Sequence, residues 1–222
     1  MGSQNSIEWC NAWDLVGGLS NPTKMPGYSY SLPATSCKSG KKLRKVKGSV
    51  CSRCYAHKGM YVFPCVKHAM KRRLKSIYRK GWVEAMVFLL HHQKSSDCFR
   101  WHDSGDIQSI THFKRLVKVC ALTPHIKFWL PTHEKKMVLD AIRSGVTIPK
   151  NLVIRFSSCM INAPVRVQDV SLFNASSTFV GEMDERRKKI ERPCNAPKRG
   201  GKCVNCRLCW DKLVKAVSYK LH

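Results

Sequence analysis

Acidic residues are scarce in this sequence. Only 14 Asp and Glu stand against 40 Lys and Arg, which gives a formal net charge of +26 over 222 residues. Between residues 38 and 80 there are 15 Lys or Arg and not one carboxylate. A solvated surface normally mixes both signs of charge, so we favour a polyanionic partner, a nucleic acid, over a solvated basic face. An anionic membrane surface is a third interpretation.

Long apolar runs are absent as well. No stretch approaches the roughly 18 uninterrupted apolar residues of a membrane helix, and the first residues lack the basic start and apolar run of a secretory signal. We therefore expect a soluble, intracellular protein without a membrane partner. Its length suits one medium domain, and its 43% hydrophobic content is enough to form a core.

Cysteine, by contrast, is abundant, with 12 in the chain. A reducing cytosol does not preserve disulfides, so clustered thiols there indicate metal binding or redox chemistry. We expect the isolated cysteines to be small buried residues instead. These are Cys10, Cys98, Cys120 and Cys159.

Hydrophobic periodicity predicts an α/β fold. Turn signals indicate an irregular lead-in over residues 1–27. Strands are expected over 28–32, 98–102, 126–130, 152–156 and 178–180, and helices over 66–78, 82–92, 113–120 and 138–142. Such alternation favours a partial (β/α) barrel of roughly five parallel strands over residues 28–183. Residues 184–222 would form a C-terminal, cysteine-rich, cluster-binding segment.

The C-terminal cysteines carry the strongest chemical signal. Cys203, Cys206 and Cys209 follow one another at steps of three residues, and Cys194 lies nine residues before them. This spacing is typical of a [4Fe–4S] loop with one distant fourth ligand. Zinc is the alternative, although zinc sites usually draw on two separated cysteine pairs, and unliganded thiols are a third interpretation. The intervening run of Lys, Arg and Gly over residues 198–202 would stabilise the negative charge of four thiolates.

A second cysteine set follows the first expected strand. Cys37, Cys51 and Cys54 would leave one iron of a four-iron cluster open to a small molecule. Cys65 could instead complete a zinc site, and a metal-free set is also open.

A third set of residues lies at two expected strand ends. His102, Asp103, Ser104, Gly105 and Asp106 follow the second strand, and His133 and Glu134 follow the third. The carboxyl ends of parallel strands share one edge, so these groups could bind a divalent metal, or the amine and hydroxyls of a ligand. The alternative is helix capping by Ser104, Asp106 and Thr132.

Three motifs carry a resemblance to a known family. They are the segment from Ser31 to Cys37 with Cys51–Gly59, the His102–Asp106 segment, and Cys203–Trp210. Together they resemble the phage-encoded "gene product 88" family, over residues from about 18 to 211.

The layout is also distantly similar to radical S-adenosylmethionine enzymes. That similarity implies that Cys37, Cys51 and Cys54 hold a cluster whose open iron binds the methionyl amine and carboxylate. It implies that residues 102–106 replace the Gly-Gly-Glu segment of that superfamily, and that the C-terminal cysteines hold an auxiliary cluster. The chain departs from the superfamily in its first cysteine gap, which is 13 residues long instead of three. Closure entropy grows slowly with loop length, so three thiolates can still converge.

Three functions follow from these patterns. The first is a radical-SAM-like iron–sulfur enzyme that contains one or two [4Fe–4S] clusters and acts on or near nucleic acid in the cytoplasm of the infected host cell. The second is a non-catalytic nucleic-acid-binding protein with structural iron–sulfur or zinc sites. The third is a divalent-metal-dependent nuclease that uses His102, Asp103, Asp106, His133 and Glu134.

Overall fold

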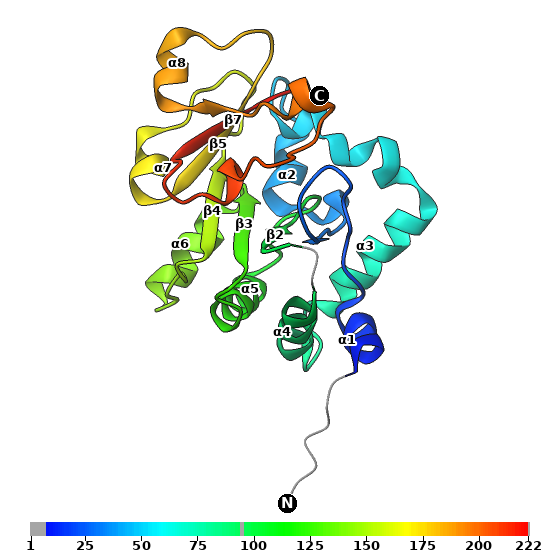
Figure 1. The fold of residues 1–222 in the computed structure, drawn as a ribbon. Helices are drawn as coiled ribbons and strands as arrows, with labels where there is room; N and C mark the ends of the chain where they lie inside the picture. The colour runs from blue at the N-terminus through cyan, green and yellow to red at the C-terminus, as the bar shows by residue number, and fades with distance from the viewer. Residues whose placement is uncertain (1–7, 94–95, 222) are drawn as a thin grey trace, which may run out of the picture.

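The fold is built on one parallel β-sheet. The computed structural model describes residues 8–93 and 96–221. Seven strands occur in the order β1-β2-β3-β4-β5-β7-β6, and every neighbouring pair is parallel (Figure 1). The strands are β1 (Ser29–Tyr30), β2 (Cys98–Trp101), β3 (Lys127–Thr132), β4 (Leu152–Ser157), β5 (Asn174–Phe179), β6 (Arg192–Pro193) and β7 (Ala216–Lys220).

Helices connect the strands, and short 3₁₀ turns lie mainly in the cysteine-rich loops. The α-helices are α1 (Trp9–Val16), α2 (Lys38–Leu43), α3 (Pro64–Ser76), α4 (Trp82–His92), α5 (Ile110–Leu122), α6 (Lys135–Arg143), α7 (Val167–Leu172) and α8 (Glu185–Ile190). The 3₁₀ turns are η1 (Ala34–Ser36), η2 (Cys51–Arg53), η3 (Tyr55–His57), η4 (Gly59–Val62), η5 (Ala196–Arg199) and η6 (Leu208–Trp210). Among the described residues, no helix is both long and apolar enough to span a bilayer.

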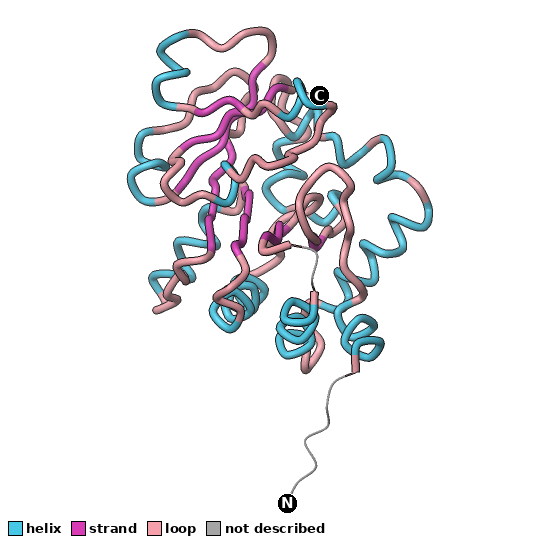
Figure 2. The backbone as a smooth tube through the Cα atoms, in the orientation of Figure 1, coloured by secondary structure: helices cyan, strands magenta, loops and turns pink. Residues whose placement is uncertain are grey.

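The two faces of the sheet bury different side chains. Phe99, Trp101 and Phe128 belong to the main core, together with buried residues of α1, α4, α5 and α6. These four helices lie along one side of the sheet in Figure 1. Residues that alternate with them, such as Cys98 and Trp129, pack instead against the C-terminal loop in a second cluster. Helices therefore cover one face of β2 and β3, while a cysteine-rich loop covers the other (Figure 2).

Most of the expected elements are present, and the α/β class with a parallel sheet is confirmed. Helix α4 has the expected bounds, and the strands of residues 98–102, 126–130 and 152–156 agree to within two residues. Strand β5 begins at Asn174, four residues before the expected start. The sequence did not predict this start, because residues 174–178 are mostly polar and show no alternation of apolar and polar side chains. The curvature and closure of a barrel are not shown: the described strands form an open row that ends at β1 and β6.

The lead-in differs from expectation. It is not wholly irregular, because α1 buries Ala12 and Val16 and ends at Gly17, whose φ of 76° suits a left-handed cap. The part of the lead-in before residue 8 lies outside the described residues. The C-terminal segment supplies β6 and β7 to the sheet, with β7 paired between β5 and β6.

His112 is a buried imidazole in the main core. Its Nδ1 accepts the Gln108 backbone N–H at 3.2 Å, and its ring meets Trp82 edge-on. Burial, together with nearby Arg115, lowers the pKa of His112 to about 3. In the unfolded chain His112 is therefore protonated near pH 6.5, whereas in the folded chain it is protonated only near pH 3.

This difference predicts stability that is lost as pH falls below about 6.5, by up to about 1.4 kcal/mol per pH unit from this residue. His112→Phe should flatten the dependence of the unfolding free energy on pH between about pH 7 and about pH 5. Urea unfolding across that range measures it, with His68→Phe on the exposed side of α3 as the control. An unchanged slope in His112→Phe would contradict the prediction.

Candidate metal centres

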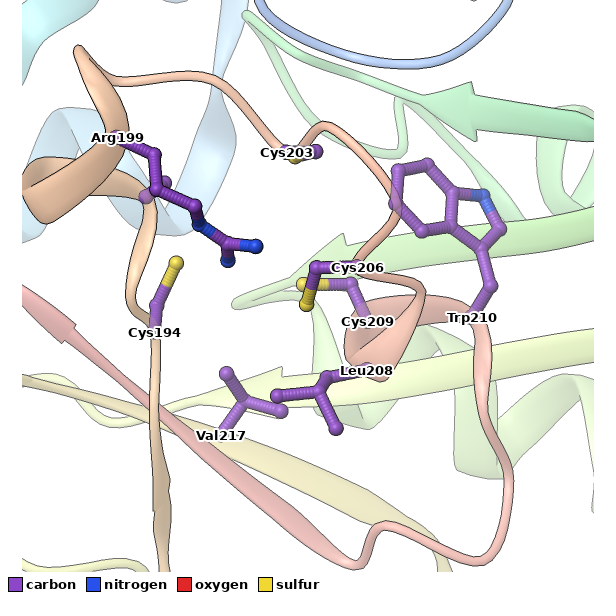
Figure 3. Close-up of a pocket in the computed structure, with 9 residues that line it drawn as sticks. Cys194, Arg199, Cys203, Cys206, Leu208, Cys209, Trp210 and Val217 are labelled. Carbon is purple, nitrogen blue, oxygen red and sulfur yellow. The ribbon is translucent and has the colours of Figure 1, made fainter.

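Four cysteines of the C-terminal segment line one pocket. Cys194 follows β6 directly, and Cys203, Cys206 and Cys209 come from the loop that ends in η6. The pocket is lined by Cys194, Ala196, Arg199, Cys203, Cys206, Leu208, Cys209, Trp210 and Val217. Figure 3 shows the sulfur of Cys194 facing those of Cys206 and Cys209 across the pocket, with the Arg199 side chain reaching into the space between them.

A buried arginine on β4 holds this loop in place. Arg155 donates to the carbonyls of Cys209 at 3.0 Å, Val214 at 2.8 Å, Leu208 at 2.8 Å and Asp211 at 2.9 Å. Its side chain has no exposed surface. Four backbone carbonyls thus solvate a cation that would otherwise be costly to bury, and the loop is fixed at both sides of Cys209.

Further bonds tie the pocket to the sheet and to the N-terminal region. The Trp210 indole donates to the Phe99 carbonyl at 2.9 Å. The backbone N–H of Cys194 donates to Ser218 at 2.8 Å, and that of Cys203 to Lys24 at 2.9 Å. The four thiols are therefore positioned by bonds to β2, β7 and the residue 22–25 turn.

The thiols of the pocket oppose one another's ionisation. Burial raises the pKa of Cys203, and nearby Cys194 and Cys206 raise it further. Burial likewise raises the pKa of Cys209 to about 12, against the hydrogen bond from the Tyr219 hydroxyl and the charge of Arg155. A positively charged metal centre would relieve this repulsion and displace the protons.

The donor set consists of four thiols, which are ligands of both iron–sulfur clusters and zinc. Among residues 8–93 and 96–221, no three His, Cys, Asp or Glu side chains converge closely enough to hold one metal ion. The four cysteines line one shared pocket. A four-iron cube binds its thiolates at separate corners, whereas zinc needs all its ligands around one atom.

The second cysteine set assembles beyond the carboxyl end of β1. Cys37 directly follows η1, Cys51 is the first residue of η2, and Cys54 directly follows η2. A Cβ at Gly40 would lie 3.6 Å from the Cys51 sulfur and 3.7 Å from the Cys37 sulfur. The two thiols therefore share the space that a glycine leaves open, despite the 13 residues between them.

The third set joins this site. The Glu134 carboxylate accepts the Ser39 backbone N–H at 2.7 Å and the Ser39 hydroxyl at 2.9 Å, in the first turn of α2 after Cys37. Burial raises the pKa of the Cys37 thiol, and Asp106, Cys54, Cys51 and Glu134 raise it further. The sequence places the cysteines and the carboxylates in separate motifs, and the fold brings them to one sheet edge.

Asp106 is fixed by three donors. Its oxygens accept the Thr132 hydroxyl at 2.6 Å, the Ile107 N–H at 2.8 Å and the His133 N–H at 2.9 Å. Burial raises the pKa of Asp106 to about 7, despite these bonds. The capping interpretation is wrong for Ser104 and Asp106, because Ser109 caps α5. The Thr132 hydroxyl does accept the Glu134 N–H at 2.9 Å at the start of α6.

The rest of the His102–Asp106 loop presents unpaired polar atoms. Both ring nitrogens of His102 and the Ser104 hydroxyl are buried without a hydrogen-bond partner among the described residues. Burial, with His112 and Arg100 adding to it, lowers the pKa of His102, so its ring is neutral. Gly105 has φ 83°, and a Cβ there would lie 2.6 Å from that of Leu32, so only glycine allows this approach.

Asp103 and His133 have different surroundings. Asp103 accepts the Ser29 hydroxyl at 2.8 Å and the Tyr61 hydroxyl at 3.1 Å, and the Tyr55 hydroxyl donates to its carbonyl. Burial lowers the pKa of His133, and Glu134 opposes the shift. Asp103 is thus held by tyrosines of the cysteine loop, whereas Asp106 is held by β3 and its loop.

The remaining cysteines differ in exposure, and one residue that holds the C-terminal site, Arg155, was not singled out from the sequence. Cys159 was expected to be buried, but it is exposed and adds to the raised pKa of Cys51, and its carbonyl accepts the Val50 N–H at 2.9 Å. Cys65 is exposed at the start of α3. The expected burial is confirmed for Cys98 and Cys120 and is wrong for Cys10. Arg155 could have been noticed as a lone charge inside the apolar run of residues 152–156.

The family relationship agrees with the motifs that carry the resemblance. The family model described as Gene product 88 matches residues 10–212, which include both cysteine sets and the carboxylate loop. The chain belongs to the Gene product 88 family. Neither the curated proteins nor the solved structures compared with the chain include a match. Similarity to radical S-adenosylmethionine enzymes is not shown and stays a prediction.

The Arg155 bonds predict that the C-terminal loop depends on one side chain. Arg155→Met leaves four carbonyls without a donor and should destabilise the fold by about 3 kcal/mol or more. Backbone hydrogen exchange should rise first over residues 206–214, which carry those carbonyls. Arg143→Met, an exposed arginine of α6, is the control and should change neither quantity. Unchanged exchange in the loop of Arg155→Met would contradict the prediction.

Proposed function

We propose that this protein is a phage-encoded iron–sulfur enzyme with a radical-SAM-like organisation that acts on or near nucleic acid. The observation that carries the proposal is the meeting of Cys37, Cys51 and Cys54 with Asp106 and Glu134 at the carboxyl edge of a parallel sheet. Ligands of α/β folds bind at that edge. Three cysteines leave one iron of a cube without a protein thiolate.

Each residue of the edge site has a separate task. When bound there, a four-iron cluster supplies an electron and an open iron for the amine and carboxylate of S-adenosylmethionine. Glu134 anchors the start of α2 through Ser39 and so orients Cys37. Asp106, with a pKa of about 7, can hold or release a proton at its carboxylate. His102 and Ser104 offer their unpaired polar atoms to a ligand.

The C-terminal site supports a different role. All of its protein ligands are thiols, and apolar Leu208, Trp210 and Val217 close the pocket around them. Four thiolates would occupy all four iron corners of a cube. A cluster there serves as an auxiliary site that stabilises the fold or stores an electron, with no open position for a substrate.

The nucleic-acid partner rests on the segment that contains the edge site. Over residues 38–80, every Lys and Arg except Arg73 is exposed, and no acidic residue interrupts them. Phe63 is exposed in the same segment, at 48%. Cations hold a phosphate backbone and exposed aromatic groups stack on bases, so this combination suits single-stranded nucleic acid.

The other two functions stay predictions with less support. A nuclease would need the carboxylates of Asp106 and Glu134 to bind divalent ions, whereas both already accept hydrogen bonds from the protein. A non-catalytic nucleic-acid-binding protein accounts for the C-terminal pocket. That function does not explain why the polar atoms of His102 and Ser104 are buried without hydrogen-bond partners among the described residues.

Iron analysis tests the two sites separately. Anaerobically purified protein should be brown and contain about eight irons and eight sulfides per chain. Cys51→Ser and Cys206→Ser should each lose about four irons, and only Cys51→Ser should abolish S-adenosylmethionine binding measured by calorimetry. Cys10→Ser, at an exposed cysteine of α1, is the control and should retain all the iron.

Two results would contradict the proposal. Colourless protein with one zinc per four cysteines would replace clusters by structural zinc. Full S-adenosylmethionine binding in Cys51→Ser would separate the edge site from that cofactor.

Salt dependence tests the nucleic-acid partner. Anisotropy of a labelled single-stranded oligonucleotide should give a binding constant that falls steeply with salt. The double variant Lys41→Gln, Lys42→Gln should reduce the slope of log K against log salt by about 0.7 for each lysine that pairs with a phosphate. Lys136→Gln, on exposed α6, is the control. No measurable binding at low salt would remove nucleic acid from the proposal.

A further inference from the structure

Arg100 differs from the other enclosed arginines of the fold. Arg73 donates to the Gly18 and Leu19 carbonyls and to the Ser31 hydroxyl, and Arg155 donates to four carbonyls. Arg100 has no such set of acceptors among the described residues. Its Nε is buried without a partner there, and its other nitrogens reach only the Met25 sulfur at 3.3 Å and the Tyr55 hydroxyl at 3.2 Å. The charge of Asp103 acts on Arg100, but no carboxylate among the described residues forms an ion pair with its guanidinium.

One side of Arg100 leads to the C-terminal pocket. Its guanidinium carbon lies 4.3 Å from the centre of the Trp129 ring. Trp129 stacks on Tyr219 with ring centres 6.2 Å apart. The Tyr219 hydroxyl lies 3.1 Å from the Cys209 sulfur. An unbroken series of side chains therefore connects the guanidinium with a thiol of that pocket.

The other side of Arg100 leads to the edge site. Tyr55, which accepts from Arg100, directly follows Cys54 in the chain and donates to the Asp103 carbonyl. Arg100 lies on β2, three residues before Asp103, so the strand itself links it to the carboxylate loop.

We propose that Arg100 is a shared electrostatic residue of the two cysteine sites, which stabilises the reduced state of the cluster at each of them. The inference rests on the proposed function, because it requires clusters at both sites. A four-thiolate cluster carries net negative charge, and one added electron increases it. A fixed cation in a low-dielectric interior favours the more negative state and so raises the reduction potential. Arg100 would thus affect the reaction through the reduction potentials of the clusters, without contact with a substrate.

Redox titration followed by electron paramagnetic resonance tests the role of Arg100. Dithionite is the one-electron reductant, and each cluster is isolated in the background of the other site's variant, Cys51→Ser or Cys206→Ser. Arg100→Gln should shift the midpoint potential of both clusters to more negative values. Arg100→Lys keeps the charge and should leave both potentials near those of the parent protein.

Arg207 provides a matched control. It donates to the Val204 carbonyl at 2.7 Å and the Cys206 carbonyl at 3.0 Å, and its charge opposes the raised pKa of Cys203. Arg207→Gln should therefore lower the potential of the C-terminal cluster alone. Arg115→Gln, which removes the hydrogen bonds to Ile77 and Arg79 on the helical side, should move neither potential.

The outcomes distinguish the shared role of Arg100 from the proposed function. Iron at both sites with potentials that Arg100→Gln leaves unchanged, or shifts at one site only, overturns the shared role and leaves the clusters standing. Protein without iron at either site overturns both. If Arg100→Gln fails to load iron, the Arg100→Lys variant decides the question. Midpoint potentials near those of the parent protein support a role for the charge of Arg100. Shifted potentials overturn that role and indicate that the hydrogen bonds of the guanidinium matter instead.

Discussion

The buried charge of Arg155 is the constraint on which the C-terminal half depends. A guanidinium without exposed surface must find acceptors inside the protein, and β4 offers none of its own, because strand carbonyls are paired with β3 and β5. The loop of residues 208–214 supplies four carbonyls and thereby covers the sheet face that lacks helices. The hydrogen bonds from Arg155 to these carbonyls therefore position the loop that carries Cys206 and Cys209, and they direct the chain from this loop back to the sheet as β7.

The edge site depends on hydrogen bonds between different strand ends. Thr132 and His133 of β3 and its loop donate to Asp106 after β2, and Glu134 accepts from Ser39 beside Cys37. Gly105 lets the same loop touch Leu32 after β1. Three consecutive strands are thus joined through side chains and close backbone approach just beyond the sheet, where backbone pairing has ended. Such a network fixes the cysteines without a covalent crosslink.

The sequence predicted what local periodicity encodes. The β2, β3 and β4 strands and α4 have dense apolar patterns, and their positions agree with expectation. The spacing of Cys203, Cys206 and Cys209 also predicted that they would share a site with Cys194, and all four line one pocket. Strands β6 and β7 were missed, because Arg192–Pro193 is short and Ala216–Lys220 lies in a charged context. The union of the Cys37 set with Asp106 and Glu134 depends on long-range contacts that no local pattern carries.

The two cysteine sites have different surroundings, and the different roles proposed for them follow from this difference. The C-terminal pocket is lined by four thiols, by apolar side chains and by Arg199. The edge site mixes thiols with a carboxylate of pKa about 7 and with a neutral histidine whose nitrogens are unpaired among the described residues. Proton transfer and ligand binding require groups of the second kind. For that reason the proposed function assigns chemistry on a substrate to the sheet edge.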